Sequence, residues 1–373
     1  MDVFLAIFKR FNIISGEMIA RLEKPEDFHS FISKKIEISE HVAISTLFIG
    51  NGLDSMYMFE KIYKRKLENL QTSIILDKNR LQRNPEAFKY LRTKKLLNIF
   101  NINESNFKNN FFSRIKEIFH VNHKKIFLFD SDILITGANM EDSYYKYKID
   151  RYFIIRSRDL SKKLYHQMFS FSNTDFIDRT EYCCPNIKII SFTEKTELRI
   201  FKEILNYNLK AIYISTAFLN FSGTLISGLK NRNVTIFTAS PRCNTFKFNP
   251  TIEEIVKNIY TLNAIEILTK NNTVSYYEYD KENFYFHSKG FWAFEEDFCI
   301  SIIGSSNYNV RSSSRDSELN FLVVSENKNV INIFENEIKE LLIVCKKVTL
   351  EDLKARNVSF ISKVLKPIFK NYL

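Results

Sequence analysis

The chain has 373 residues, 45% of them hydrophobic and 26% charged, which is typical of a globular protein with a large core and room for two domains. Its eight glycines and six prolines exclude collagen-like and low-complexity classes. A formal net charge of +11 favours an anionic partner, such as nucleic acid, a phosphorylated substrate or an acidic membrane surface, without choosing among them.

The first predicted unit is an N-terminal segment, residues 1–38. Its apolar start, residues 1–11, is interrupted by Lys9 and Arg10, so it is too short for a transmembrane span, and it lacks a small-residue cleavage site. An interfacial amphipathic helix, a poor organelle-targeting segment and a plain first core helix all fit this stretch.

Strand-like apolar runs alternate with helical patterns through both halves of the chain. In the first half we expect strands at 42–50, 73–77, 125–129, 133–136 and 152–155, with helices at 54–69 and 160–170. In the second half we expect helices at 193–207, 252–268 and 330–344, with strands at 211–215, 234–239, 276–279, 289–294, 299–303 and 319–324. The alternation predicts an α/β fold with mixed sheets, built twice, with a boundary near residues 173–186.

One internal stretch, residues 211–229, carries no charge and is long enough to span a bilayer. It contains many Ser, Thr, Asn and Gly residues, and it begins with a strand-like Ala-Ile-Tyr-Ile. We therefore expect a buried strand followed by a loop and a helix, and not a transmembrane helix.

The five cysteines show no paired spacing, and two of them, Cys183 and Cys184, are adjacent. Their odd number and scatter favour a reducing compartment over a disulfide framework. No Cys-x-x-Cys pair or His/Cys cluster in the sequence resembles a zinc site, so we expect neither a metal nor another cofactor.

Two histidine–lysine pairs carry the strongest functional signal. Each pair is followed by a small-residue turn that ends in asparagine, and then by a carboxylate. The two sets are His123, Lys125, Asn139 and Asp150, and His287, Lys289, Asn307 and Glu318. The separation from asparagine to carboxylate is 11 residues in both sets (139 to 150 and 307 to 318). This matched spacing indicates a duplicated half-site.

Two imidazoles on opposite sides of one phosphate suit nucleophilic displacement, in which one attacks phosphorus and the other protonates the leaving oxygen. Each lysine lies two positions after its histidine, on the same face of a strand, so Lys125 and Lys289 are expected to stabilise the phosphoryl oxygens. The asparagines can donate further hydrogen bonds, and each carboxylate can hold the distal nitrogen of an imidazole. Which histidine is the nucleophile is left open.

This constellation resembles the phospholipase D superfamily, whose motif is His-x-Lys-x4-Asp followed by Gly-Ser-x-Asn. The first copy has the aspartate, Asp130, but carries Thr-Gly-Ala-Asn at residues 136–139 instead of the full turn. The second copy has Phe294 where the aspartate belongs, and the complete turn Gly-Ser-Ser-Asn at residues 304–307. Asp130 is counted with the catalytic residues because it belongs to the motif, although a structural role suits it better.

The resemblance implies two α/β/α lobes with mixed sheets, related by pseudo-twofold symmetry, that share one active site. We assign residues 39–178 to the first lobe and residues 179–373, with C-terminal helices, to the second. Ser305 joins the two asparagines and the two carboxylates as a phosphate-binding or orienting residue. Arginine binds phosphate bidentately, and the candidates for the substrate phosphates are Arg80, Arg83, Arg242 and Arg311.

Within the superfamily the chain is similar to the eukaryotic-type phosphatidylglycerophosphate synthases, through an ordered set of short motifs from about residue 40 to the last strand. They include residues 137–144, 217–220, 239–244 and 286–292. This resemblance implies phosphatidyl transfer from CDP-diacylglycerol to glycerol 3-phosphate through a phosphohistidine, with release of CMP. It also implies peripheral association with an anionic membrane, a place at the mitochondrial inner membrane, and no nucleic-acid partner.

Three alternatives remain open at the level of sequence. A phospholipase D-type phosphatidylserine synthase would use the same lipid donor with serine as acceptor, and the motif at 239–244 favours the glycerophosphate enzyme over it. A superfamily phosphodiesterase acting on nucleic acid would use the charge of +11 for backbone affinity. A membrane-associated scaffold without activity is disfavoured by the intact His, Lys and Asn sets.

Overall fold

The computed structural model describes residues 19–77, 80–81, 84–96, 121–169, 179–184, 186–246 and 249–370. The first half contains, in chain order, β1 (Ile19–Leu22), α2 (Pro25–Ile38), β2 (His41–Thr46), α3 (Leu53–Leu67), β3 (Gln71–Leu76), α5 (Pro85–Thr93), β4 (Ile126–Phe129), β5 (Asp132–Thr136), α7 (Asp142–Lys146), β6 (Lys148–Ile149), β7 (Tyr152–Arg156) and α8 (Arg158–Phe169).

The second half contains β8 (Arg179–Cys184), β9 (Ile187–Phe192), α9 (Glu194–Leu205), β10 (Ala211–Thr216), α10 (Gly223–Gly228), β11 (Val234–Ala239), α11 (Pro250–Lys270), β12 (Val274–Tyr279), β13 (Tyr285–Phe286), β14 (Gly290–Phe294), β15 (Cys299–Gly304), β16 (Asn320–Ser325), α12 (Lys328–Val344), β17 (Cys345–Lys347), α13 (Leu350–Lys354) and α14 (Phe360–Phe369).

The two halves build sheets with the same internal plan, which confirms the predicted duplication. The first sheet has the order β3-β2-β4-β5-β7-β1, and the core of the second has the order β11-β10-β14-β15-β16-β9. In both, the first pair is parallel and the other four pairs are antiparallel. The second sheet is extended at its edges by β12, β17 and β8. The short pair β13-β6 joins one lobe to the other.

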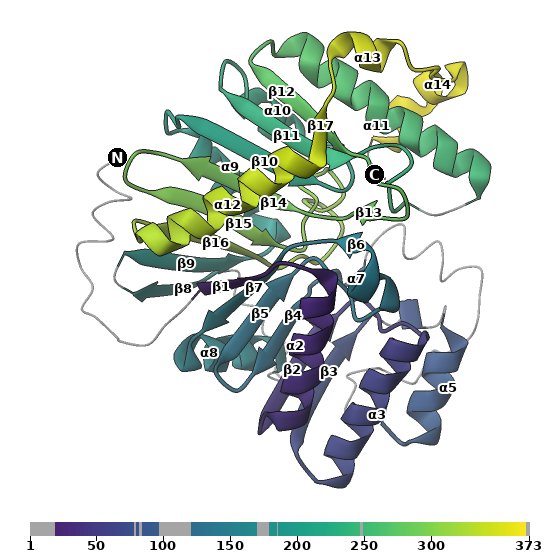
Figure 1. The fold of residues 1–373 in the computed structure, drawn as a ribbon, viewed down its shortest axis with the longest axis vertical. Coiled ribbons are helices and arrows are strands. Elements are labelled where there is room, and N and C mark those ends of the chain that lie inside the picture. The colour runs from purple at the N-terminus through teal and green to yellow at the C-terminus, as the bar shows by residue number, and fades with distance from the viewer. Residues whose placement is uncertain are drawn as a thin grey trace.

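Helices cover the faces of both sheets (Figure 1). The helices α2, α3, α5 and α7 pack on the outer face of the first sheet. The helices α9, α10 and α11 pack on the outer face of the second. A third cluster joins side chains of both sheets and includes Leu160 of α8 and Phe334 of α12. Each lobe is therefore an α/β/α unit with a mixed sheet, as predicted.

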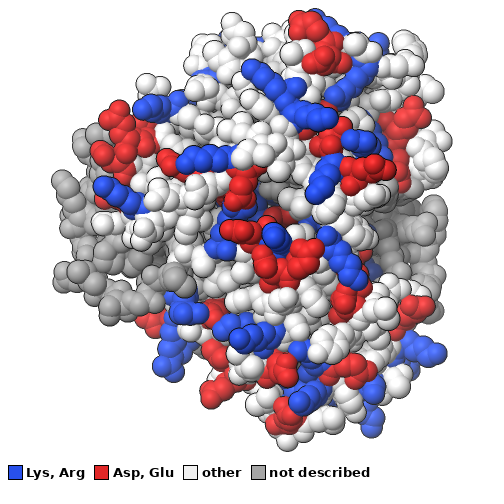
Figure 2. Space-filling view, in the orientation of Figure 1, with Lys and Arg blue, Asp and Glu red and all other residues white. Residues whose placement is uncertain are grey.

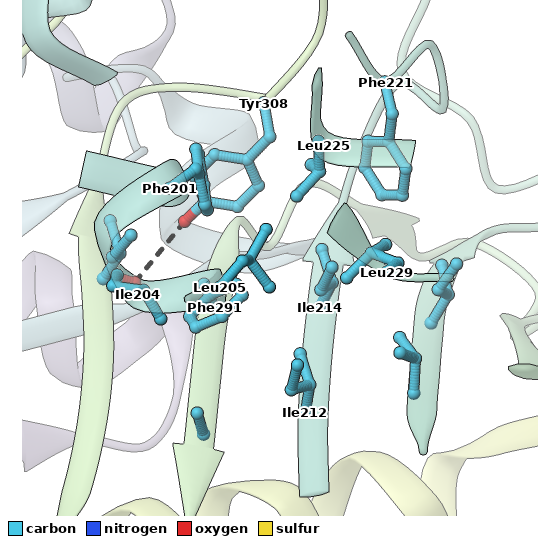
Figure 3. Close-up of a cluster of buried hydrophobic side chains, with 14 of the residues drawn as sticks. Phe201, Ile204, Leu205, Ile212, Ile214, Phe221, Leu225, Leu229, Phe291 and Tyr308 are labelled. Carbon is cyan, nitrogen blue, oxygen red and sulfur yellow. Dashed lines mark hydrogen bonds between the residues drawn. The ribbon is translucent and has the colours of Figure 1, made fainter. Parts of the chain in front are cut away.

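The packing in the second lobe explains the uncharged stretch at residues 211–229. Its first part is β10, whose Ile212 and Ile214 are covered by α9 and α10 (Figure 3). Its last part is α10, which places the buried Leu225 over the same sheet face (Figure 3). The expected strand, loop and helix are confirmed. In the described part of the chain, no helix combines the length and hydropathy needed to cross a bilayer.

The N-terminal boundary differs from the prediction. Strand β1 pairs antiparallel with β7 at the edge of the first sheet, and α2 buries Phe28, Ile32 and Ile36 in the core of the first lobe. Their spacing of four residues places these side chains on one face of the helix. Residues 19–38 thus belong to the first lobe and not to a separate segment. Residues 1–18 and 170–178, which carry the rest of the predicted segment and the first part of the stretch predicted for the lobe boundary, lie outside the described residues, and the later part of that stretch contains β8.

A buried ion pair locks the two lobes together. The Arg151 guanidinium, which enters from the first lobe, donates from Nε and Nη2 to the two carboxylate oxygens of Glu337 on α12, both at 2.8 Å. It also donates to the carbonyl oxygen of Ile302 at 2.6 Å and stacks over the Trp292 ring at 4.1 Å. Breaking such a pair from one side typically costs about 3–5 kcal/mol, because the remaining charge stays buried. The contact therefore fixes the neighbouring Asp150 relative to the second lobe.

Candidate active site

The two histidines precede equivalent strands, and each is anchored to the opposite lobe. His123 lies before β4 and donates its backbone N–H to the carbonyl oxygen of Ser317 at 2.9 Å. His287 lies before β14 and donates its backbone N–H to the carbonyl oxygen of Ile149 at 2.8 Å. Ser317 and Ile149 each come directly before a predicted carboxylate in the sequence. The backbone therefore brings each histidine next to the carboxylate of the other repeat.

The side chains follow the same crossed arrangement. His123 Nδ1 lies 3.0 and 3.1 Å from the two carboxylate oxygens of Glu318. His287 Nδ1 lies 2.7 Å from Asp150 Oδ2. A proton on each Nδ1 would face its carboxylate and leave the Nε2 lone pair available for attack or proton transfer. The histidine of one repeat is thus paired with the carboxylate of the other repeat.

The two lysines are fully buried beside the imidazoles. Lys125 Nζ donates to the carbonyl oxygen of His123 at 2.7 Å, and Lys289 Nζ donates to that of His287 at 2.6 Å. Lys289 Nζ also lies 3.2 Å from His287 Nε2 and 3.8 Å from Asp150 Oδ2. Burial lowers the pKa of Lys125 to about 7 and that of Lys289 to about 8, although nearby carboxylates oppose the shift. A bound anion would favour the charged form of both lysine amines.

Burial also sets the charge of the histidines and carboxylates. Desolvation, followed by the charge of the adjacent lysine, lowers the pKa of both His123 and His287 well below the ordinary value. Both imidazoles are therefore neutral near pH 7, as a nucleophile or a general base must be. Desolvation raises the pKa of Glu318 to about 7 and raises the pKa of Asp150 as well.

The small-residue turns support the two carboxylates. The Ser305 hydroxyl donates a short hydrogen bond to Glu318 Oε2. A Cβ at Gly137 would lie 2.7 Å from Asp150 Oδ1, so the turn needs glycine for this close approach. Asn139 Nδ2 donates to the Tyr144 hydroxyl at 3.4 Å. Asn307 Oδ1 is buried and makes no hydrogen bond within the described residues, so this amide has capacity left for a ligand.

The structure places Asp130 outside the site, which corrects its predicted catalytic role. Asp130 lies in the turn after β4, at the opposite end of that strand from His123. Its carboxylate accepts hydrogen bonds from the backbone N–H groups of Glu40 and His41 at 3.2 and 2.8 Å. The aspartate of the first motif therefore organises the start of β2 and does not contact the histidines.

The four candidate arginines differ in their positions. Arg311 Nε donates to Asp316 Oδ2 at 2.8 Å, and its charge contributes, after burial and Lys125, to the lowered pKa of His123. Arg80 donates its backbone N–H to Asp77 Oδ1 at 3.0 Å, and its charge opposes the burial-driven rise in the pKa of Tyr144. The exposed Arg242 is paired with Asp280. Arg83 lies outside the described residues.

Three further residues surround His287 that had no predicted role. The Tyr144 hydroxyl lies 3.2 Å from His287 Nε2, and the Phe218 ring stands perpendicular to the imidazole at 6.2 Å. Lys148 Nζ lies 4.3 Å from the Tyr144 ring centroid and 3.1 Å from Glu141 Oε2. Tyr144 ends the segment 137–144 used for the family resemblance, and this was the available signal for it. Phe218 lies in a further segment of that resemblance, residues 217–220, whereas Lys148 carried no such signal.

A second layer of carboxylates lies beneath Glu318. Its backbone N–H donates to Glu194 Oε2 at 2.9 Å. The buried Glu197 accepts from Asn320 Nδ2 at 3.2 Å, and burial raises its pKa to about 8. These contacts fix the start of β16 and keep Glu318, two residues before it, next to His123.

Comparison with known sequences finds relatives with one shared name, although no family model matches the chain. The chain is 23% identical to a probable CDP-diacylglycerol–glycerol-3-phosphate 3-phosphatidyltransferase of Dictyostelium discoideum, over 70% of this chain and 58% of that protein. It is 22% identical to the mitochondrial protein of that name from Gallus gallus and 21% identical to the one from Homo sapiens, in both cases over 96% of this chain and 84% of the relative.

Comparison with solved structures finds the same fold across nearly the whole chain. Phosphatidylserine synthase of Haemophilus influenzae superimposes with a TM-score of 0.78 at 19% identity, over 95% of both chains. Polyphosphate kinase of Porphyromonas gingivalis superimposes with a TM-score of 0.56 at 8% identity, over 95% of this chain and 53% of the kinase. The chain therefore shares this duplicated fold, with a His-x-Lys pair from each lobe in one site, and is similar in sequence to proteins named CDP-diacylglycerol–glycerol-3-phosphate 3-phosphatidyltransferase.

Proposed function

We propose that this protein transfers the phosphatidyl group of CDP-diacylglycerol to glycerol 3-phosphate and releases CMP. The observation that carries the proposal is the crossed pair of neutral histidines, each held by a carboxylate of the opposite lobe beside a buried lysine. This arrangement suits two successive displacements at one phosphorus. The shared name of the relatives supports the choice of donor and acceptor.

In the first step, Nε2 of one histidine attacks the phosphatidyl phosphorus. A phosphorus–nitrogen bond forms while the bond from that phosphorus to the bridging oxygen breaks, and CMP leaves with the electron pair. The Nδ1 proton stays shared with the carboxylate of the opposite lobe, which offsets the positive charge that develops on the ring. Lys125 and Lys289 stabilise the negative charge on the equatorial oxygens.

In the second step, a hydroxyl of glycerol 3-phosphate attacks the phosphohistidine. The hydroxyl proton passes to Nε2 of the other histidine, and the phosphorus–nitrogen bond breaks, so the first imidazole regains its electron pair. The Tyr144 hydroxyl, 3.2 Å from His287 Nε2, is placed to orient the group that approaches this side. The first histidine ends neutral. The other histidine ends protonated and returns to its neutral form by releasing that proton to solvent, which readies the site for another donor.

The decisive experiment offers the purified protein CDP-diacylglycerol with glycerol 3-phosphate, with serine, or with neither. We expect CMP release that depends on glycerol 3-phosphate, with phosphatidylglycerophosphate as the lipid product. CMP release that depends on serine alone would assign the phosphatidylserine synthase reaction, which the fold of the Haemophilus enzyme keeps as the second candidate. Cleavage of DNA without lipid activity would also overturn the proposal. On the face shown in Figure 2, basic and acidic side chains are interspersed and form no continuous basic track for nucleic acid.

The lowered lysine pKa values predict proton uptake when a phosphate ligand binds. In the free protein, Lys125 and Lys289 lose their charge as the pH rises through about 7 and 8. A bound anion favours the charged amines and raises both pKa values, so CMP binding near pH 8 should take up about one proton. Near pH 6 both amines are already charged, and the uptake should vanish.

Calorimetric titration with CMP, in two buffers of different ionisation enthalpy, measures this uptake. Lys125→Met should reduce it, and kcat/KM for transfer should fall as the pH rises above about 8 because the cationic form is lost. Equal binding heats in both buffers near pH 8 would show that the lysines do not titrate with the ligand.

We also propose that the protein acts at the surface of a mitochondrial membrane. The support is the location in the names of the Gallus and Homo relatives, together with a lipid donor and a net charge of +11.

A further inference from the structure

The C-terminal helix α14 presents an uncovered apolar face. Phe360, Ile361, Val364 and Ile368 are exposed by 78%, 58%, 55% and 59%. Their spacing of one, four and eight residues from Phe360 places them on one side of the helix. Soluble proteins seldom expose several large apolar side chains next to one another unless the surface meets a partner or a membrane.

The orientation of α14 is set by contacts on its other side. Ser362 is buried, and Lys366 Nζ pairs with Glu266 Oε2 of α11 at 2.7 Å. The same ammonium donates to the carbonyl oxygen of Leu262 at 3.3 Å, and the Ser359 hydroxyl caps the first turn. Figure 1 shows α14 on the outside of the second lobe, beside α11. The apolar face therefore points outward because the opposite face is docked.

The end of α14 is tied to the active-site loop. Asn220 Nδ2 donates to the carbonyl oxygen of Lys370, the residue after the helix, at 2.7 Å. Asn220 belongs to the loop that follows β10, and Phe218 in that loop packs against the ring of His287. A surface that binds α14 therefore lies next to the loop that contacts His287.

The charge of residues 354–373 indicates which kind of surface α14 contacts. From residue 354 to the C-terminus the sequence contains no Asp or Glu, but it contains Lys354, Arg356, Lys363, Lys366 and Lys370. Lys363 and Lys370 are exposed beside the apolar face. Apolar side chains flanked by lysines are typical of helices that lie in the headgroup region of an anionic bilayer. A second copy of this chain, itself at +11, would be repelled.

We propose that the exposed face of α14 inserts into the headgroup region of an anionic lipid bilayer. This insertion would hold the loop after β10, which contacts His287, close to the bilayer. The bilayer would then present its lipids beside the loop that contacts His287. The use of this surface to deliver CDP-diacylglycerol rests on the proposed function, whereas binding to the bilayer does not. The two ideas can therefore be tested separately.

The test uses the full chain and vesicles of phosphatidylcholine with and without phosphatidylglycerol. The first variant replaces Phe360, Ile361 and Ile368 by serine, and the second carries Lys363→Gln and Lys370→Gln. The matched control carries Ile38→Ser and Leu67→Ser, because these apolar side chains are similarly exposed, by 60% and 63%, at the ends of α2 and α3 in the first lobe.

Co-sedimentation should show that the triple serine variant loses vesicle binding by about 100-fold, from three partly inserted side chains. The lysine variant should lose about fivefold for each lysine, only on vesicles that contain phosphatidylglycerol. The control should bind like the unchanged protein. Undiminished binding by the triple serine variant would overturn the proposal. Conversion from dimer to monomer in that variant, seen by light scattering, would overturn it as well, because the face would then be a self-association surface.

CMP release from CDP-diacylglycerol separates this proposal from the proposed function. In detergent micelles the α14 variants should turn over like the unchanged protein, which also shows that they are folded. On vesicles they should lose turnover in parallel with binding. An unchanged protein that binds vesicles through α14 but releases no CMP would refute the proposed function and leave the docking surface standing.

Discussion

Replacing His123 or His287 by alanine should lower phosphatidyl transfer by at least about 10⁴-fold in each case. One variant lacks the nucleophile and the other lacks the group that takes the proton from the acceptor. Neither function can be replaced by the other histidine, because each imidazole is held in place by a separate carboxylate. Near-normal turnover in either variant would refute a site shared between the lobes.

A single-turnover measurement distinguishes the two histidines. CMP is a good leaving group, so the variant that keeps the nucleophile should still release one equivalent of CMP and trap a phosphoenzyme. The other variant should release none. His166→Ala, at an exposed position on α8, is the matched control and should behave like the unchanged protein. Emission from Trp292, the only tryptophan and buried beside Arg151, reports whether the contact between the lobes is intact.

The crossed pairing predicts which carboxylate variant resembles which histidine variant. Glu318→Gln should act through His123, and Asp150→Asn through His287, each with a loss of about 10³–10⁴-fold, because an imidazole without its carboxylate loses its tautomer and orientation. The amide side chains keep the size of the carboxylates, so the fold should survive.

Single turnover again provides the measurement. Glu318→Gln and His123→Ala should fall in one class of CMP release, and Asp150→Asn and His287→Ala in the other. The opposite grouping would mean that each carboxylate serves the histidine of its own repeat. Asp130→Asn is the control, since this carboxylate belongs to the sequence motif but binds backbone amides away from the site, and transfer should be unchanged.

Elements with strong local patterns were predicted well from the sequence. The strand at 234–239 has the predicted bounds, and the predicted helices at 252–268 and 330–344 lie within α11 and α12. Alternating or helical periodicity over a buried face is a local property, so a short window of sequence contains it. The repeated order of these elements was sufficient to predict a duplicated α/β fold.

Elements that depend on distant partners were not predicted. Strand β1 forms only because β7 offers an open edge, and β13 exists as the partner of β6. Strand β9, with the sequence Ile-Lys-Ile-Ile-Ser-Phe, pairs with β16 and directly follows the stretch taken for the lobe boundary. A chain segment whose hydrogen-bond partners lie far away in sequence carries little local signal for its conformation.

The sequence by itself determined the chemistry of the site: two His-x-Lys pairs, each with an asparagine and a carboxylate at matched spacing. Only the tertiary structure decided how these groups combine. His123 and Glu318 are 195 positions apart, and their contact depends on how one lobe packs against the other. The same packing buries both lysines, lowers their pKa values, and leaves Asp130 at the far end of β4. Burial and pairing across a lobe interface arise from the whole chain, and residue spacing does not encode them.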